Sequence, residues 1–302
     1  MIILSKRSLI KYVKTAIICI VIILLVLLLC HFINLKTKPT NRTYAYENDN
    51  AAIPLTVTDS ILIPDASNYS PGSGFTCTGL AYDNVDDVFW VGNYGSEYPK
   101  SDVVLPTIIK MSKDFKEIED EIRIYEIFPD RNINLQGVAY DNSDDSLWFA
   151  DGEYIQHVSK EGIDLGFIEL GDYQKYKSNG ICYDEKTDSL WVLFYYNYLV
   201  NFSKDGIVLE VMECDYVDQD QLCIDESGNN LYFSVGADYK GDENYLCKVD
   251  LNAKKISVSY KLLGSYAVEG ISILDRQLYV MNDGHFHSAL INSNLVNKYK
   301  LK

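Results

Sequence analysis

The sequence lacks the short motifs that identify most hydrolases and nucleotide-binding proteins. Its 302 residues contain no Gly-x-Ser-x-Gly elbow, no His-Glu-x-x-His pair and no glycine-rich phosphate loop, which argues against the familiar members of both classes. It also has no Cys-x-x-Cys pair, and the five cysteines beyond residue 50 are an odd number. The cysteines therefore do not indicate a disulfide framework.

Basic residues are scarce outside the N-terminal region. Residues 1–50 hold seven of the 27 Lys and Arg and two of the 43 Asp and Glu, which leaves 20 basic and 41 acidic residues, a net charge of −21, from residue 51 on. Such a surface repels phosphate backbones, so a nucleic acid partner is excluded. It suits divalent cations, although an acidic domain without a specific ligand would have the same composition.

One long apolar run occurs at the N-terminus. Residues 16–30 are unbroken apolar sequence, Phe32 and Ile33 extend the run, and four basic residues precede it. This length and charge pattern predict a transmembrane signal anchor over residues 15–34, with residues 1–14 cytoplasmic and the rest extracytoplasmic, in the cell membrane as a single-pass protein. A cleaved signal peptide or lipidation at Cys30 are the alternatives. Residues 35–54 are polar and are predicted to form a flexible linker.

The remainder, residues 55–302, consists of imperfect repeats. Residues 136–151 predict a β-hairpin, with short apolar strands on either side of a turn of Asp, Asn and Ser. The same order returns at residues 78–93, 179–194, 220–235 and 269–283. We name the second residue of each repeat its anchor, and the spacings between successive anchors are 58, 43, 41 and 49 residues: Gly79, Gly137, Gly180, Gln221 and Gly270. Such periods predict an all-β fold, a β-propeller of about five, or six, four-stranded blades.

Two features of the repeats predict how the propeller closes and packs. Residues 60–65 have the pattern of an outer strand without its own blade, so we expect them to complete the last blade, near a short final strand at residues 298–302. The third strand of the last blade is predicted at residues 289–291. The aromatic side chains at one equivalent position are predicted to pack between blades: Trp90, Trp148, Trp191, Tyr232 and Tyr279. Cys182 and Cys223, at positions where other units carry Ala or Ser, are predicted to be core residues rather than disulfide or metal ligands.

A ring of oxygen-bearing side chains is predicted at one mouth of the central channel. The residues directly before the anchors are Thr78, Gln136, Asn179, Asp220 and Glu269. Because inner strands surround the channel, these side chains would encircle its mouth and offer the oxygen ligands that Ca²⁺ prefers. Polar residues also begin strands that open on a wet channel, and the pattern alone does not separate the two interpretations.

The ends of the second strands return to the same mouth. Asn93, Asp151, Asn282 and Asp283 are therefore expected on its rim, where they could contact a ligand. His285 and His287 follow on a rim loop, and a histidine there could act as a general base, although an idle exposed histidine is the alternative. The aspartates at the opposite ends of the first strands are interpreted as turn formers: Asp83, Asp141, Asp184 and Asp225.

Several of these segments resemble known families. Residues 178–184 and 220–225 are similar to the Asn-Gly and Asp-Gly segments of the gluconolactonase and regucalcin family, and residues 268–270 to its Glu-Gly segment. Residues 136–141 and 147–151 equally resemble the SdiA-regulated family of envelope propellers. Both are NHL/TolB-type β-propellers. The first resemblance implies a Ca²⁺ ion held by Asn179, Asp220 and Glu269 that serves lactone hydrolysis.

Two functional hypotheses follow. The first is a membrane-anchored propeller that binds Ca²⁺ at the channel mouth and recognises a small-molecule or envelope ligand, or a protein partner. Its ligand-binding residues would be Thr78, Gln136, Asn93, Asp151 and Asp283. The alternative is a Ca²⁺-dependent lactonase or esterase with His285 and Asp220 as catalytic residues. A structural propeller without a ligand is a third, plainer possibility.

Overall fold

The computed structural model describes residues 14–15, 17–26, 40–41, 45–47, 52–64, 75–94, 105–195, 198–214, 219–235, 244–283 and 294–301. The chain divides into two units, Met1–Thr40 and Asn41–Lys302. In the first unit, residues 14–15 and 17–26 are helical. Within the described part of the chain, no helix has the length and hydropathy needed to cross a membrane. The predicted anchor at residues 15–34 extends beyond the described helix and stays a prediction.

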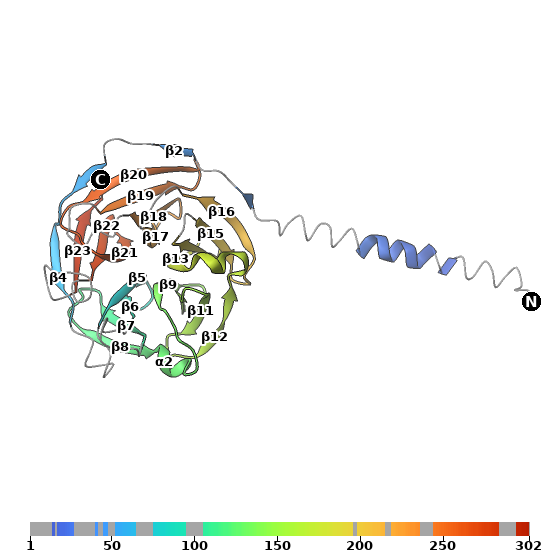
Figure 1. Ribbon diagram of the computed structural model, residues 1–302, viewed down its shortest axis with the longest axis horizontal. Coiled ribbons are helices and arrows are strands. Elements are labelled where there is room, and N and C mark those ends of the chain that lie inside the picture. Colours follow the sequence, from blue (N-terminus) through green and yellow to red (C-terminus); the bar gives the residue numbers. More distant parts are fainter. Residues whose placement is uncertain are drawn as a thin grey trace, which may run out of the picture. The chain divides into compact units, whose positions relative to one another are not determined.

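The second unit is a five-bladed β-propeller, which confirms the all-β fold and decides between five and six blades (Figure 1). Each blade is an antiparallel sheet, and the innermost strands β5, β9, β13, β17 and β21 contact one another around the axis. Blade 1 comprises β5 (Cys77–Asp83), β6 (Val88–Asn93), β7 (Thr107–Ser112) and β8 (Ile118–Arg123), and blade 2 comprises β9 (Gln136–Asp141), β10 (Ser146–Ala150), β11 (Tyr154–Ser159) and β12 (Asp164–Glu169). Blade 3 comprises β13 (Ser178–Asp184), β14 (Ser189–Phe194), β15 (Tyr198–Ser203) and β16 (Val208–Glu213), and blade 4 comprises β17 (Gln219–Ile224), β18 (Asn230–Val235), β19 (Tyr245–Asp250) and β20 (Lys255–Leu262). Blade 5 comprises β21 (Val268–Leu274), β22 (Gln277–Asn282), β23 (Leu295–Lys300) and β4 (Asp59–Leu62). Short helical segments α2 (Ile124–Ile127) and η2 (Gly171–Tyr176) connect blades 1 to 2 and 2 to 3.

The hairpin between the first two strands of a blade is fixed by its aspartates. Asp83 accepts hydrogen bonds from the backbone N–H groups of Val85 and Asp86 at 2.9 and 3.0 Å, and Asp141 accepts one from Ser143 at 3.0 Å. An Asx turn of this kind satisfies backbone donors that the ladder leaves unpaired. Asp184 and Asp225 cap their turns in the same way, so the interpretation of all four aspartates as turn formers is confirmed.

The core is divided among the five interfaces between blades. Five clusters of buried side chains each combine residues from two neighbouring blades. The repeated aromatic residue falls in a different cluster each time, as the sequence predicts: Trp90, Trp148, Trp191, Tyr232 and Tyr279. One blade cannot bury both faces of its sheet, and stacking on its neighbours removes that apolar surface from water.

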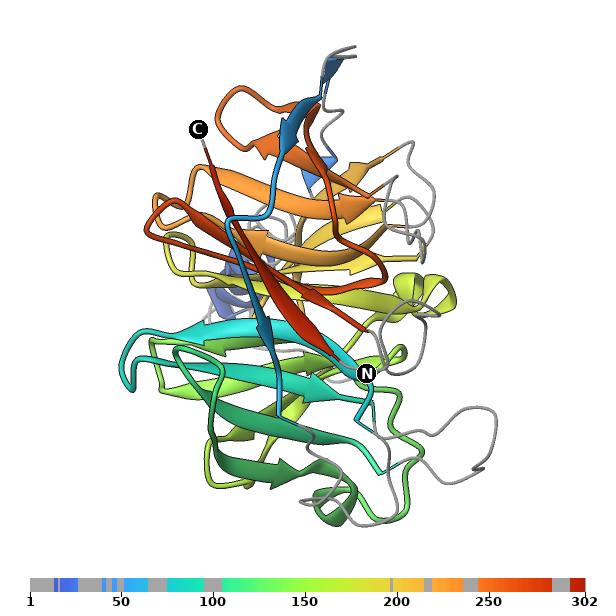
Figure 2. The ribbon, with the colours of Figure 1, turned by 90° about the vertical axis from the view of Figure 1, so that its left-hand side faces the viewer.

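The propeller closes with a strand from the N-terminal side of the domain. β4 pairs antiparallel with β23, with Ile61 opposite Val296, and Figure 2 shows the blue β4 alongside the red β23. This confirms that residues 60–62 complete the last blade. The expected third strand of that blade was wrong, because Leu295–Lys300 takes this place, while residues 289–291 lie outside the described residues. The single strand Leu295–Lys300 therefore takes the place of the two strands predicted at residues 289–291 and 298–302.

The predicted linker contributes strands of its own. β1 (Thr40–Asn41), β2 (Ala45–Glu47) and β3 (Ile53–Leu55) lie in or at the end of this segment. β2 and β3 both pair in parallel with β20, the outer strand of blade 4, and Leu55 is buried. An outer strand exposes unpaired backbone groups, and these short strands cover them. The segment thus acts partly as an edge cover, which its polar composition did not indicate.

Around the channel axis, the inner strands approach so closely that a Cβ atom does not fit without a shift at the four glycine anchors. A Cβ atom on Gly79 would lie 2.4 Å from the backbone nitrogen of Val138, and one on Gly137 would lie 2.9 Å from the carbonyl oxygen of Asn179. Each anchor lies at a β-bulge, where the register between first and second strands shifts. Gly79 and Gly137 are the bulged residues in blades 1 and 2, with φ of 74° and 73°, a conformation that favours glycine.

This close approach predicts an unequal response to two Gly→Ala substitutions. Gly79→Ala should lower the free energy of unfolding by more than about 3 kcal/mol, because the new Cβ atom meets backbone of the next blade. Gly171→Ala is the matched control: its φ is +55° but no atom lies within 4 Å of the added Cβ, so only the left-handed conformation costs energy, about 1–2 kcal/mol. Urea denaturation followed by tryptophan fluorescence measures both. Equal losses would contradict the close approach of the blades.

Candidate functional site

The predicted ring of side chains lies where the inner strands begin. Asn179 and Glu269 are the extra residues of their β-bulges, since Ser178 and Gly180 pair with adjacent residues of β14, and Val268 and Gly270 with adjacent residues of β22. In β17, Asp220 lies in the corresponding irregular region. A bulge changes the direction of a side chain relative to the sheet, and bulges are common beside binding sites.

Neighbouring members of the ring are in contact in pairs. The Asn179 side-chain amide donates to Oδ1 of Asp220 at 2.8 Å, and Gln221 donates to the same oxygen at 3.2 Å. On the other side of the ring, the Thr78 hydroxyl donates to Oε1 of Gln136 at 3.4 Å. The structure thus brings together two of the three predicted calcium ligands, Asn179 and Asp220, through a direct hydrogen bond.

Three carboxylates gather at this mouth. Burial raises the pKa of the Cys77 thiol well above its usual range, and the negative charges of Asp283, Glu269 and Asp220 raise it further. Asp283 is fully buried and Glu269 is 9% exposed. The region around Cys77 is therefore negative, which favours a cation. Within the described ranges, no three His, Cys, Asp or Glu side chains are grouped closely enough to hold a metal ion by themselves, so the calcium site stays a prediction that includes Asn179.

Asn93 holds the chain in place at this rim. Its side-chain oxygen accepts a hydrogen bond from the Thr76 backbone N–H at 3.1 Å, and its amide group donates to the Thr107 hydroxyl at 3.1 Å. Asn282 occupies the equivalent place in blade 5 and accepts from the Tyr266 backbone N–H at 2.9 Å. Both side chains are fully buried. The structure therefore gives Asn93 a structural role, and its predicted ligand contact remains untested.

Asp151 is similarly engaged. Its Oδ1 accepts backbone hydrogen bonds from Glu153 and Tyr154 at 3.0 and 2.6 Å. Its Oδ2 accepts from the Gln156 amide at 2.7 Å and from the Arg131 guanidinium at 2.9 Å. These four bonds fix the turn between β10 and β11 and leave the carboxylate nearly buried. The predicted general base His285, with His287, lies outside the described residues.

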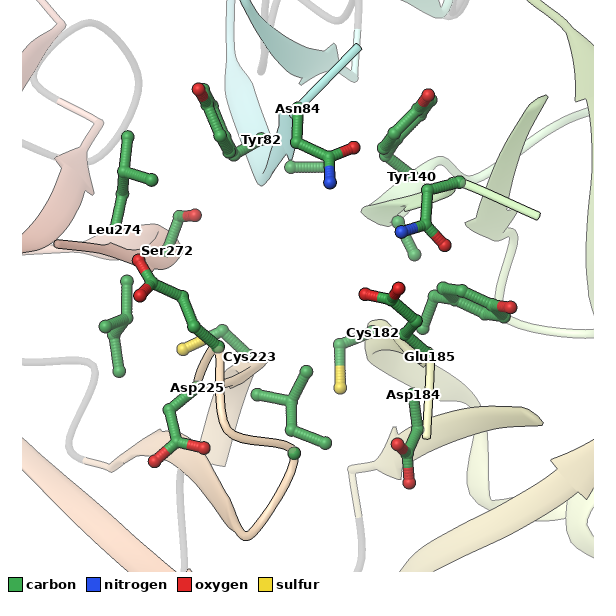
Figure 3. Close-up of a pocket in the computed structure, with 18 of the residues that line it drawn as sticks. Tyr82, Asn84, Tyr140, Cys182, Asp184, Glu185, Cys223, Asp225, Ser272 and Leu274 are labelled. Carbon is green, nitrogen blue, oxygen red and sulfur yellow. The ribbon is translucent and has the colours of Figure 1, made fainter. Parts of the chain in front are cut away.

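A cavity opens at the opposite mouth of the channel, where the first strands end (Figure 3). Its volume is about 880 Å³, in the range of pockets that bind small molecules. The walls come from all five inner strands, and none of the anchor residues lines it. Sequence reasoning placed the site at the other mouth and missed this one. A signal existed: the fifth residue after each anchor is polar, namely Asn84, Asn142, Glu185, Glu226 and Asp275.

Lysines connect neighbouring blades around this cavity. Lys160, at the turn after β11, reaches Oδ2 of the buried Asp83 in blade 1 at 3.2 Å. One blade further on, Lys204 reaches Oδ2 of the buried Asp141 at 3.1 Å. Each aspartate also accepts the indole N–H of its own blade's tryptophan, Trp90 at 3.1 Å and Trp148 at 3.2 Å. Lys160 and Lys204, each at the turn after the third strand of its blade, therefore join neighbouring blades.

The pairing of a lysine with a buried aspartate of the preceding blade does not continue between blades 3 and 4. Leu251 stands at the position of these lysines in blade 4, and Asp184 instead accepts the Thr187 hydroxyl at 2.7 Å. Among the described residues, the buried indole N–H of Trp191 has no hydrogen-bond partner. An unmade hydrogen bond of a buried donor costs about 1–3 kcal/mol, so this blade interface depends more heavily on apolar packing.

Comparisons with known proteins bear on the fold alone. No model of a known protein family matches the chain, and no curated protein matches it. The resemblance to the SdiA-regulated and gluconolactonase–regucalcin families is therefore not confirmed and still depends on the short motifs.

Several solved structures are similar at low identity. Hydrazine synthase from Kuenenia stuttgartiensis matches with a TM-score of 0.46 and 9% identity over 68% of this chain, which spans 55% of that chain. A nidogen/laminin complex matches with a TM-score of 0.50 and 16% identity, over 70% of this chain and 73% of the other. The β-propeller domain of Cps50 (Swd1) from Myceliophteria thermophila matches with a TM-score of 0.43 and 10% identity, over 75% of this chain and 66% of that chain. These similarities, all at 16% identity or less, say nothing of activity.

The Lys204–Asp141 pair predicts a pH-dependent loss of stability. Lys204→Met should lower the free energy of unfolding by about 3 kcal/mol at pH 7, because it leaves a buried carboxylate without its cation. Although burial raises the pKa of Asp141, hydrogen bonds from Ser143, Lys204 and Trp148 hold it below its usual value. A carboxylate with a lowered folded-state pKa contributes stability above the unfolded value of about 3.9, and loses it as the pH falls through the folded value.

The difference between wild type and Lys204→Met should therefore be full at pH 5–7 and shrink below about pH 4. Urea denaturation across this range measures it. Lys116→Met is the control, since Lys116 pairs with Asp114 at 2.8 Å on the exposed surface and such pairs contribute little. A pH-independent difference, or an equal loss in the control, would contradict the inter-blade role of Lys204.

Proposed function

We propose that the chain is a membrane-anchored, extracytoplasmic β-propeller that binds Ca²⁺ where its inner strands begin and recognises an envelope or extracellular ligand there. The observation that carries this proposal is the direct contact between two predicted ligands on the ring, Asn179 and Asp220, at 2.8 Å. The negative charges of Asp220, Glu269 and Asp283 all act on the buried thiol of Cys77, which agrees with a negative mouth. Asn179 adds a side-chain oxygen to this set and contacts Asp220 directly. The donors are all oxygens, which suits a hard divalent cation.

The bound ion would have two effects on this mouth. It would neutralise carboxylates that repel one another, and it would present open coordination positions to an oxygen atom of a ligand. Thr78 and Gln136 lie on the same ring and touch each other at 3.4 Å, so they are placed to hydrogen-bond a ligand beside the ion. Asn179, Asp220 and Glu269 would hold the ion, and Asp283 would add negative charge from the rim.

Anchoring in the membrane is supported by the sequence of the N-terminal segment. Residues 16–30 are apolar without interruption, and Lys6, Arg7, Lys11 and Lys14 precede them. This arrangement favours a cytoplasmic N-terminus and an extracytoplasmic propeller. The acidic propeller surface would then face the outside, where millimolar Ca²⁺ is compatible with a moderate affinity.

The alternative, a Ca²⁺-dependent lactonase or esterase, has no feature of the described residues in its favour over recognition. Its carboxylate candidate, Asp220, accepts hydrogen bonds from Asn179 and Gln221. Its histidine candidate, His285, lies outside the described part of the chain. We therefore place the recognition function first.

Calcium binding should stabilise the folded protein. We expect the melting temperature of the full chain to rise as Ca²⁺ is added, because the ion binds the folded state only. The double variant Asp220→Asn with Glu269→Gln should abolish that rise, since it removes two charges while keeping the side-chain shapes. Differential scanning calorimetry with and without EDTA measures the effect.

The control for this experiment removes two charges elsewhere. Glu119→Gln with Asp172→Asn changes exposed acids on β8 and η2 and should leave the Ca²⁺ response intact. An undiminished rise in the Asp220/Glu269 variant would refute the assigned ligands. Turnover of small lactones by the Ca²⁺-loaded protein, lost in that same variant, would instead favour the hydrolase.

The proposed transmembrane anchor can be tested separately by membrane fractionation. The full chain should remain in the membrane pellet after alkaline carbonate extraction, because residues 15–34 bury apolar surface in the bilayer. A chain that begins at residue 40 retains β1, β2 and β3 and should appear in the soluble fraction. Release of the full chain by carbonate would contradict the transmembrane anchor.

A further inference from the structure

The cavity at the mouth where the first strands end has a polar outer edge and apolar walls. Leu80, Val138, Ile181 and Leu222 line it from four inner strands. Further out lie five carboxylates, Asp184, Glu185, Asp225, Glu226 and Asp275, against two lysines, Lys113 and Lys186. The lining is therefore apolar inside and carries an excess of negative charge outside, which raises the local concentration of cations.

Neither lysine forms a described ion pair with a carboxylate of the lining. Lys113 pairs with Asp87 at 2.7 Å, outside the cavity lining, and Lys186 donates to the side-chain oxygen of Asn229 at 2.9 Å. Asp184 and Asp225 are occupied as turn caps. The three remaining carboxylates, Glu185, Glu226 and Asp275, form what we name the acidic rim.

The acidic rim has no cation among the described residues. Within the described residues, one hydrogen bond joins its members, from the backbone N–H of Asp275 to Oε1 of Glu226. Figure 3 shows Glu185 and Asn84, the first residues of the turns after β13 and β5, extending toward the open centre of the cavity. The rim carboxylates thus act on whatever enters this mouth.

A second observation points into the same cavity. One residue of each inner strand forms a ring deeper in the channel: Ala81, Ala139, Cys182, Cys223 and Ser272. Ser272, Cys182 and Cys223 are 7%, 8% and 6% exposed, and within the described residues none of the three makes a hydrogen bond. Their hydroxyl and thiol groups line the cavity from three neighbouring blades (Figure 3). Buried polar groups usually have partners, so these three are available to a ligand.

The type of cation follows from how the charges are spread. Within the part of the chain that the structure describes, no three acidic, histidine or cysteine side chains are close enough to hold a metal ion, and each rim carboxylate comes from a different blade. A compact ion cannot reach them together, and the apolar walls offer it nothing. A cation with an organic body would fill the 880 Å³ and leave its charge at the rim.

We infer that this cavity is a second binding site, for a small organic ammonium ligand with an apolar body. The body packs against Leu80, Val138, Ile181 and Leu222, the ammonium group lies among Glu185, Glu226 and Asp275, and a polar atom at the inner end can bond to Ser272. This site is separate from the proposed calcium mouth, because the glycine-lined anchor ring, which contributes nothing to the cavity, lies between them.

The test uses the full chain in phosphatidylcholine nanodiscs, with empty nanodiscs as the blank. Isothermal titration calorimetry at pH 7 compares three probes that share a phenyl group on a short chain: 2-phenylethylamine, 2-phenylethanol and 3-phenylpropanoate. The amine should bind at least about tenfold more tightly than the neutral alcohol, and the anion more weakly than the alcohol, because of the rim charge. The preference should decrease as salt screens it.

Two triple variants locate the site. Glu185→Gln with Glu226→Gln and Asp275→Asn should lower the affinity for the amine to that for the alcohol. Glu119→Gln with Glu169→Gln and Asp172→Asn removes the same charge from exposed acids outside the cavity and should leave the affinity unchanged. Equal loss in both variants would mean that the overall field, and not the rim, attracts the amine, and would overturn the assignment.

The two thiols give an independent readout. Burial raises the pKa of both thiols, so methyl methanethiosulfonate should modify Cys182 and Cys223 only slowly, and the reaction is followed at pH 9. Bound 2-phenylethylamine should slow both reactions several-fold further, as measured by peptide mass spectrometry. Absence of amine binding, equal binding of the three probes, or unchanged thiol reactivity at saturating amine would each refute the site. The Asp220→Asn, Glu269→Gln variant should bind the amine as wild type does, so failure at one mouth is distinguishable from failure at the other.

Discussion

The inner strands of the five blades meet backbone to backbone near the channel axis, and most of the architecture depends on how closely they can do so. A Cβ atom on Gly79 or Gly137 would lie within 3 Å of the next blade, which fixes glycine at these positions. The same crowding bends each first strand into a β-bulge, and the bulges direct Asn179 and Glu269 differently from the rest of their strands. The ring thus divides the channel into two mouths with separate chemistry.

At the mouth where the first strands end, charges serve two different purposes. Asp83 and Asp141 are buried, cap their turns, accept an indole N–H and receive a lysine from the next blade. Such carboxylates are part of the scaffold, since they are fully enclosed by donors. The rim carboxylates, by contrast, have no such partners among the described residues. In blades 1 and 2 the buried carboxylates are paired with a lysine of the next blade, whereas the rim carboxylates remain where solvent or a ligand can reach them.

The two mouths differ in the cation they suit. Where the inner strands begin, amide and carboxylate oxygens are close enough for direct contacts, as between Asn179 and Asp220, which favours a compact hard ion. Where they end, the carboxylates surround a cavity with apolar walls, which favours a large cation with an organic body. The net negative charge of the propeller supports both, and the geometry at each mouth decides which kind of cation fits.

The sequence by itself determined the repeat, the fold class, the turn aspartates and the strand that closes the last blade, because each depends on local patterns of apolar residues and turn formers. It also placed Thr78, Gln136, Asn179, Asp220 and Glu269 on one ring. Only the tertiary structure decided that Asn93 and Asp151 are held by neighbouring strands and turns, that the linker covers the edge of β20, that Lys160 and Lys204 join blades, and that the large cavity lies at the other mouth. The lysine contacts join residues 77 and 63 positions apart, and the edge pairing joins Ala45 to Lys255. No local pattern specifies which of several equivalent repeats will meet.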